Sequence, residues 1–179
     1  MAHINLDTTI PGIRSLVLFR PETGKPLYEL VQVLLRGPST LSEADRELIA
    51  AYVSQLNDCS FCRNSHAAAA TALAGNEYPE QVLANPELAG LPVKIKKLMS
   101  IAAAVQRSGR DVTNALVDDA KKSGATDREV HDVVLIAATF SMFNRYVDGL
   151  ATMTPEDPAV YQEMGIRMST NGYVLPQKK

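Results

Sequence analysis

Two cysteines and one histidine, the side chains best suited to thiol chemistry, lie close together in the run Cys59-x2-Cys62-x3-His66. The alanine-rich residues around and after them favour a helix. Because a helix advances about 100° per residue, the three side chains fall within an arc of roughly 60° on one helix face. Cysteines one turn apart can form a disulfide with little backbone movement, and a helix N-terminus favours a thiolate. His66, one turn beyond Cys62, can accept a thiol proton or hold a thiolate as an ion pair.

A carboxylate, Glu47, precedes this group, and Asn57-Asp58 lies between them as a helix break. Both residues of the break are good N-caps, so we expect two helices joined by a tight turn, with Cys59 in the first turn of the second helix. The turn falls midway between Glu47 and His66, so an antiparallel hairpin would place these side chains opposite each other. A carboxylate beside an imidazole raises its basicity and fixes its tautomer. The sequence therefore predicts contacts from Glu47 to His66 to Cys62, with Cys59 as a second thiol.

The spacing Glu-x11-Cys-x2-Cys-x3-His resembles the active-site motif of the AhpD-like alkylhydroperoxidases, within the carboxymuconolactone decarboxylase superfamily. The run ELIAAYVSQLNDCSFCRNSHAAAA resembles the peroxidase-related branch in particular. The similarity extends over most of the chain, from LVLFRPETGKPLYELVQVLLRGPSTLSEADRELIA to VVLIAATFSMFNRYVDGL. One departure is that AhpD has the pattern CxHC, whereas this chain has Ser60-Phe61 between its cysteines, so that histidine's proton relay is missing.

The resemblance implies an AhpD-like helical bundle that acts as a thiol-dependent alkylhydroperoxide reductase. It assigns the peroxidatic role to Cys62 and the resolving role to Cys59, with His66 as the base and Glu47 orienting His66. Because Cys59 is nearer the helix end, we also expect it to be more open to a reductant than Cys62.

The same resemblance implies partners. A disulfide between the cysteines must be reduced by an outside dithiol, such as a lipoyl-bearing or thioredoxin-like protein. No flavin, haem or nicotinamide motif is visible, so no cofactor is predicted. The family assembles as dimers, trimers or hexamers, so a homo-oligomer is expected.

Three alternatives use the same residues differently. The cysteine pair could serve as a redox adaptor that passes electrons between proteins and reacts with peroxide only slowly. Two cysteines, a histidine and a carboxylate could bind structural zinc, although three ligands on one helix face close a tetrahedron poorly. Lactone decarboxylation, the remaining alternative, would give the thiols no role.

Composition narrows the class of protein. The 179 residues suit one domain, with residues 1–11 as an N-terminal arm and residues 170–179 as a C-terminal tail. A net charge of −2 gives no basis for binding nucleic acid or an anionic membrane. No secretory signal pattern and no apolar run long enough for a membrane span are visible, so the two cysteines point to cytoplasmic redox chemistry.

Helix signals recur along the chain, and no stretch alternates apolar and polar residues, so we predict an all-α fold. Ser42 and Thr126 begin capping signatures, and Gly75 is a C-cap. Residues 21–24 are expected to form a turn, and 75–90 a loop with at most one turn of helix. The expected helices span residues 13–19, 26–36, 43–56, 59–74, 92–108, 112–123, 127–150 and 158–168.

Several further residues carry weaker expectations. The helix over residues 127–150 is apolar nearly all round, so it is expected at the centre or at a subunit interface. Asn144, Arg145 and Asp148 stand out near its end: either Arg145 and Asp148 pair with each other or between subunits, or these residues help to line the site. His131 is expected at the surface or an interface, and Phe61 is expected to shield the site or fill the core. Tyr52 and Ser65 are expected to be packing or surface residues near the site.

Overall fold

The computed structural model describes residues 1–85, 87 and 90–175, and within them the chain is all-α, as predicted. These residues form nine α-helices and one short 3-10 turn, and no strand occurs among them. In chain order the elements are α1 (Ile13–Phe19), α2 (Pro21–Arg36), α3 (Glu43–Leu56), α4 (Ser60–Ala74), α5 (Tyr78–Ala84), α6 (Val93–Arg107), η1 (Gly109–Asp111), α7 (Asn114–Lys122), α8 (Asp127–Gly149) and α9 (Pro158–Asn171).

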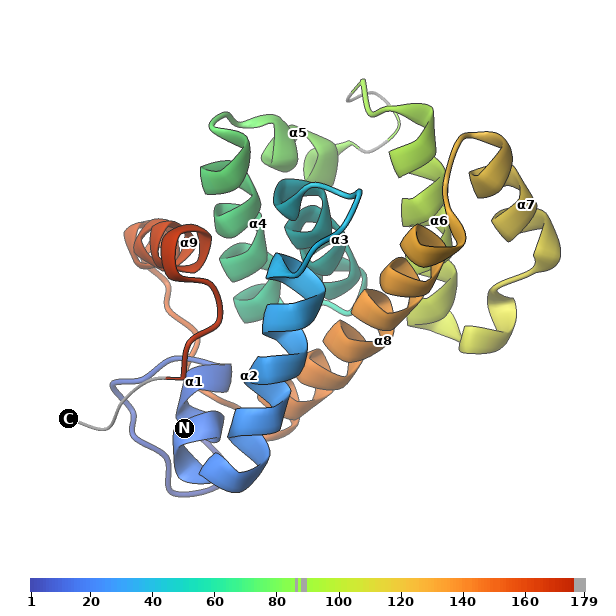
Figure 1. Ribbon diagram of the computed structural model, residues 1–179. Coiled ribbons are helices and arrows are strands. Elements are labelled where there is room, and N and C mark those ends of the chain that lie inside the picture. Colours follow the sequence, from blue (N-terminus) through green and yellow to red (C-terminus); the bar gives the residue numbers. More distant parts are fainter. Residues whose placement is uncertain (86, 88–89, 176–179) are drawn as a thin grey trace.

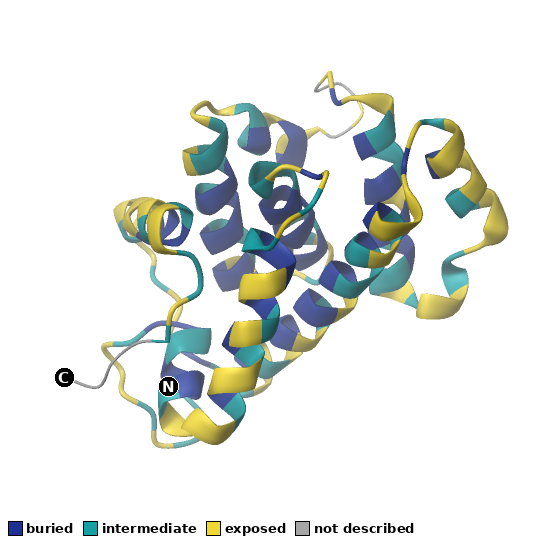
Figure 2. Cartoon of the chain, viewed as in Figure 1, coloured by how far each residue is buried: buried dark blue, intermediate teal, exposed yellow. Residues whose placement is uncertain are grey.

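The helices pack around the α3–α4 hairpin (Figure 1). Helix α9 lies against α4, and α8 crosses the molecule to contact both α3 and α6 (Figure 1). Helices α6 and α7 lie at one end of the molecule, and α1 and α2 lie at the other. Buried residues concentrate on α3, α4 and the inner side of α8, whereas α2, α7 and α9 each expose one face (Figure 2). The hairpin that carries the predicted chemistry is therefore the centre of the core.

Helix α8 is less uniformly buried than its composition suggested. One face packs in the core through Val133, Ile136 and Phe140, each no more than 2% exposed. The opposite face reaches solvent, where Met142 is 44% exposed. Its predicted capping box is confirmed, because Thr126 Oγ1 accepts from the Glu129 N–H at 3.1 Å and Glu129 Oε2 accepts from the Thr126 N–H at 2.8 Å.

The start of α2 differs from the expectation. Residues 21–24 are helical rather than a turn, and Pro26 lies inside the helix. Pro21 occupies the first turn, where a missing N–H costs nothing and the fixed φ suits a helix. Gly24 provides close packing instead of a turn, since a Cβ there would lie 2.6 Å from the carbonyl oxygen of Val17. The segment 75–90 also contains more helix than expected, in the seven residues of α5.

The N-cap of α4 lies one to two residues later in the sequence than predicted. Asn57 is the C-cap of α3, and Cys59, not Asn57 or Asp58, is the N-cap of α4. Asp58 has φ 56°, a left-handed conformation that aspartate tolerates better than most residues. The N–H of Cys59 donates to the carbonyl oxygen of Ser54 at 3.0 Å, which ties the start of α4 back to α3.

Both ends of the described chain fold onto the bundle. The N–H of His3 donates to the carbonyl oxygen of Leu150 at 3.0 Å, and that of Gly12 to Met153 at 3.0 Å, so the arm lies along the α8–α9 connection. Of the predicted tail 170–179, residues 170 and 171 end α9, and residues 176–179 lie outside the described part. No helix in the described residues is long and apolar enough to cross a membrane.

Candidate active site

The α3–α4 hairpin brings Glu47 and His66 together, where the sequence placed them. Glu47 Oε2 lies 2.6 Å from His66 Nδ1. Glu47 is fully buried and His66 is 7% exposed. Because an ionised carboxylate can only accept, the Nδ1–H of His66 is the donor in this hydrogen bond.

Two residues that sequence reasoning missed hold the other oxygen of Glu47. Arg36 Nη2 donates to Oε1 at 2.6 Å, and the hydroxyl of Tyr173 donates to the same oxygen at 2.6 Å. Burial alone would raise the pKa of Glu47, but His66, Arg36 and Tyr173 outweigh it and the pKa is lowered. Burial and the charge of Glu47 raise the pKa of Tyr173 well above its ordinary value. Glu47 therefore stays a carboxylate and Tyr173 stays a hydrogen-bond donor.

Aromatic contacts fix the imidazole ring. Phe140 of α8 meets the His66 ring edge-on, with ring centroids 4.4 Å apart. The Tyr173 ring stacks nearly parallel to it at 6.2 Å, and the Arg36 guanidinium group lies over the Tyr173 ring at 5.2 Å. Hydrogen bonds and packing together give His66 one orientation.

The two cysteines are both free thiols at the start of α4. The interaction with the neighbouring Cys59 comes first, and with burial it raises the pKa of the Cys62 thiol well above its ordinary value, against a smaller lowering by Asn144. Cys62 at rest is therefore a protonated thiol that needs a base to become a nucleophile.

Asp148 of α8 contacts the second thiol. The Cys59 thiol donates to Asp148 Oδ1 at 3.3 Å, and Asp148 itself is exposed. Arg145 donates instead to the carbonyl oxygen of Ser141 at 2.8 Å, and no ion pair between Arg145 and Asp148 is found among the described residues.

The expected accessibility of the thiols is wrong. Cys59 is fully buried, whereas Cys62 is 3% exposed. Cys59 packs in a small cluster with Leu16, Val147 and Tyr161, and Leu6 of the N-terminal arm lies against the same cluster. The N-terminus of α4 thus lies beneath other elements, so nearness to a helix end does not make Cys59 open to a reductant.

A cavity of about 240 Å³ lies beside Cys62 and His66. Its wall is largely apolar and includes Phe140, Met164 and Met168, and Phe61 also lines it, as a shielding residue should. Ser65 lines it too, but its hydroxyl donates to the Phe61 carbonyl oxygen at 2.8 Å. Cys59 and Tyr52 lie outside the cavity lining.

The remaining candidates have other surroundings. His131 is at the surface, as expected, with its side chain 68% exposed and 2.9 Å from Asp132. The described residues contain no cluster of three or more histidine, cysteine or acidic side chains arranged to hold a metal ion.

Comparison by sequence identifies the family. A family model described as "Carboxymuconolactone decarboxylase family" matches residues 21–77 and 75–154 of this chain. Together these ranges make up most of the chain. The chain therefore belongs to the carboxymuconolactone decarboxylase family. A search of curated proteins by sequence found no match.

Comparison with solved structures shows which fold the chain shares. An uncharacterized peroxidase-related protein from Silicibacter sp. TM1040 has a TM-score of 0.77 and 27% identity, over 86% of this chain and 79% of that one. An alkylhydroperoxidase AhpD core, an uncharacterized peroxidase-related protein from Ralstonia eutropha JMP134, has a TM-score of 0.77 and 22% identity, over 88% and 82% of the two chains. The AhpD-like fold predicted from the sequence is confirmed.

Proposed function

We propose that this protein reduces organic hydroperoxides with the thiols of Cys62 and Cys59. The observation that carries the proposal is the Glu47–His66 pair, joined at 2.6 Å and placed with Cys62 beside an apolar cavity. The name of the Silicibacter relative, a peroxidase-related protein, supports the same reaction class.

The first half-reaction begins with a proton transfer. His66 Nε2 accepts the proton of the Cys62 thiol, while Glu47 holds the ring and stabilises the imidazolium that forms. The Cys62 thiolate attacks the terminal oxygen of the hydroperoxide, and the O–O bond breaks. The alkoxide that leaves takes the proton back from His66, which gives an alcohol and a sulfenic acid on Cys62.

The second half-reaction closes the disulfide. The Cys59 thiol loses its proton to Asp148, the carboxylate 3.3 Å from its sulfur, and the thiolate attacks the Cys62 sulfur. The S–O bond breaks, and the hydroxide that leaves takes up a proton to form water. An outside dithiol, lipoyl-bearing or thioredoxin-like, then supplies two electrons and two protons to restore both thiols.

A redox adaptor is the second candidate function. The residues between the cysteines favour it, because Ser60 and Phe61 leave the site without the proton-relaying histidine of the CxHC pattern. In that function the pair exchanges electrons with partner dithiols, and peroxide is a poor substrate.

Intact-mass and thiol analysis separates the two candidates. Reduced wild type is treated with one equivalent of an organic hydroperoxide beside Cys59→Ser, Cys62→Ser and His66→Ala. A peroxidase loses about 2 Da within seconds as both thiols close into a disulfide, and Cys59→Ser accumulates a sulfenic acid on Cys62. A sulfenic acid on Cys59 in Cys62→Ser would reverse the roles. Thiols that stay free for many minutes in wild type would favour the adaptor.

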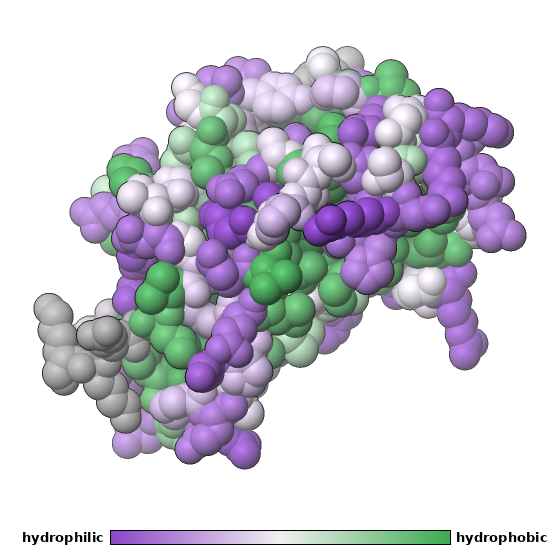
Figure 3. Space-filling view, in the orientation of Figure 1, coloured by the Kyte–Doolittle hydropathy of each residue, from purple (hydrophilic) through white to green (hydrophobic). Residues whose placement is uncertain are grey.

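Self-association is part of the proposal. Apolar side chains gather in the middle of the face that carries α2 and α8 (Figure 3), and Val33 of α2 is 68% exposed. Exposed apolar surface of this kind marks contact sites between subunits. Native mass spectrometry should find a dimer, trimer or hexamer, and a monomer at micromolar concentration would contradict this part.

A further inference from the structure

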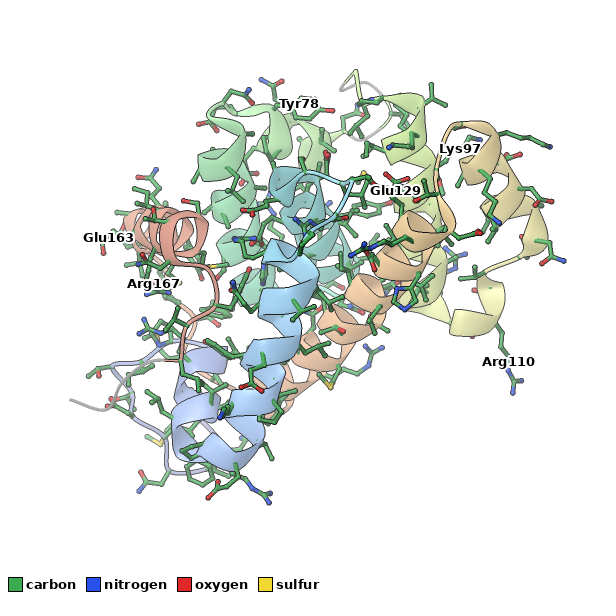
Figure 4. All side chains as sticks on the ribbon, in the orientation of Figure 1. Tyr78, Lys97, Arg110, Glu129, Glu163 and Arg167 are labelled. Carbon is green, nitrogen blue, oxygen red and sulfur yellow. The ribbon has the colours of Figure 1, made fainter. Side chains whose placement is uncertain are left out.

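The cavity beside Cys62 carries positive charge at two positions. Arg14 of α1 and Arg167 of α9 both line it, and both are half-buried. No carboxylate is found among the described residues that line the cavity. In Figure 4, Arg167 lies at the side of α9 that faces the N-terminal helices.

The two arginines share the cavity with the phenol of Tyr28. Burial lowers the pKa of Arg167, and the charge of Arg14 lowers it further. Burial raises the pKa of Tyr28 to about 12, and both arginines act against that rise, so the phenol stays neutral.

Among the described residues, Arg14 and Arg167 are not in an ion pair, whereas Arg36 and Arg63 are. The buried Arg46 also lacks an ion pair, but it donates to the carbonyl oxygens of Leu34 and Gly37. Half-buried cations without a partner are costly, and an anion bound between them would offset that cost.

We propose that the cavity binds an organic anion, and that the preferred substrate is an organic hydroperoxide that carries a carboxylate. The substrate part rests on the proposed peroxidase function. The peroxide group meets Cys62 and His66, the hydrocarbon body packs on Met164 and Met168, and the carboxylate is held by the two arginines. The carboxylate is unchanged in the reaction, so the products are a hydroxy acid, water and the disulfide.

The size of the cavity limits the substrate. Its volume of about 240 Å³ lies below the roughly 300 Å³ at which drug-sized pockets begin. A compact aromatic or short-chain acid fits such a space, whereas a full-length fatty acid would project from it.

The first test compares two hydroperoxides that have the same hydrocarbon skeleton and differ in one carboxylate. Cumene hydroperoxide and its para-carboxylate derivative react with reduced wild type, and the rate constant of disulfide formation is measured for each. We expect the carboxylate to react at least about tenfold faster, as charge-assisted hydrogen bonds to two arginines imply. The ratio should fall toward one in Arg14→Gln and Arg167→Gln, and Arg167→Lys should restore part of it.

Arg110→Gln is the matched control. Arg110 is exposed in η1, far from α9 at the other end of the molecule (Figure 4), and its loss changes the net charge by the same amount. This control should keep the wild-type ratio. A ratio near one in wild type, or a high ratio that survives both glutamine variants, would overturn the proposal while leaving the peroxidase function intact.

The second test does not depend on peroxide chemistry. Calorimetry measures the binding of para-isopropylbenzoate and of the neutral para-isopropylbenzamide to Cys62→Ser. We expect the benzoate to bind at least about tenfold more tightly, and Arg167→Gln in the same background to remove that difference. If neither hydroperoxide oxidises the thiols but the benzoate binds in this way, the peroxidase function fails and the anion site stands. Equal or absent binding of the two compounds would overturn the anion site.

Discussion

The hydroxyl of Tyr173 lies 2.6 Å from Glu47 Oε1, although 126 positions separate the two residues in the chain. Gly172, with φ 63°, turns the backbone after α9, and the N–H of Tyr173 donates to Gln32 Oε1 at 2.7 Å. A side chain at Gly172 would lie 2.5 Å from that same Gln32 atom. The end of α9 is therefore shaped to deliver one phenol to the buried carboxylate.

Tyr173→Phe removes that hydrogen bond and keeps the ring. We expect the rate of Cys62 sulfenic acid formation to fall by roughly tenfold, because Glu47 is held less firmly against His66. Tyr173 helps to lower the pKa of Glu47, so the acidic limb of the rate profile should also shift to higher pH. Stopped-flow measurement across pH reports both effects.

Tyr52→Phe is the control for this change. Tyr52 also lies on a helix of the site hairpin, but it packs with the larger core cluster and outside the cavity lining. Its rate profile should match that of wild type. An unchanged profile in Tyr173→Phe would show that Tyr173 serves packing alone.

The parts of this site differ in how far the sequence could predict them. Glu47 and His66 are 19 residues apart, and one helix break between them was enough to predict their contact. Tyr173 sits in a segment with no periodicity, and only the path of α9 brings it to the site. Arg36 is the last residue of α2, where a basic side chain ordinarily complements the helix dipole, so nothing local indicated an ion pair with Glu47. The burial of Cys59 depends on the arm and α8 lying over the start of α4, which is information that helix position alone does not contain.

Ionisation of Glu47 should make the stability of the protein depend on pH. The folded-state pKa of Glu47 lies below its ordinary value of 4.5, so the unfolded chain takes up this proton at higher pH than the folded chain does. The stabilisation is complete above pH 4.5 and is lost as the pH falls through the folded-state pKa. Glu47→Gln should cost about 3–5 kcal/mol near neutral pH, because Arg36 loses a buried partner. That difference should shrink in acid, as measured by urea unfolding at several pH values.

Glu43→Gln provides the comparison for that experiment. Glu43 also pairs with Arg36, at 3.5 Å, but its side chain is 39% exposed. Its loss should cost less than about 1 kcal/mol, the usual range for an exposed pair. A cost for Glu47→Gln that stays constant through acid pH would contradict the linkage.

The raised pKa of Cys62 depends first on Cys59. Cys59→Ala removes the interaction with that neighbour and leaves burial as the main remaining cause. The pKa of Cys62 should therefore fall, so at a fixed pH below it the variant should react faster with iodoacetamide than wild-type Cys62 does. Alkylation at Cys62, followed by peptide mass analysis across pH, checks this prediction. A pKa equal to that of wild type would mean that burial dominates.

Asp148 should matter to disulfide closure and not to the first attack on peroxide. In Asp148→Asn the Cys59 thiol keeps a hydrogen-bond partner but loses a proton acceptor. We expect closure to slow by roughly a hundredfold, the lower end of the range for a general base. The sulfenic acid on Cys62 should accumulate, where dimedone can trap it. Arg145→Gln, three residues away on the exposed side of α8, is the control. Equal trapping in Asp148→Asn and wild type would remove Asp148 from the mechanism.

We expect that Arg167 and Tyr173 reach their positions only if α9 packs closely on α4. Gly165 permits that packing, since a Cβ there would lie 2.6 Å from the carbonyl oxygen of Ala68. The Ala68 carbonyl belongs to the backbone of α4, and a Cβ at position 165 would be fixed to the backbone of α9. Neither atom could move without shifting a helix. Gly165→Ala should therefore cost about 1–3 kcal/mol in unfolding free energy, despite the better helix propensity of alanine.

Gly149→Ala is the matched substitution, because a Cβ there meets no atom within 4 Å. It should leave stability unchanged or slightly raised. Urea unfolding of both variants gives the stabilities, and hydrogen exchange at residues 172–175 reports whether the segment after α9 has detached. We expect faster exchange there in Gly165→Ala alone, together with slower oxidation of Cys62. A Gly165→Ala protein as stable as wild type would show that α4 and α9 can separate without affecting the site.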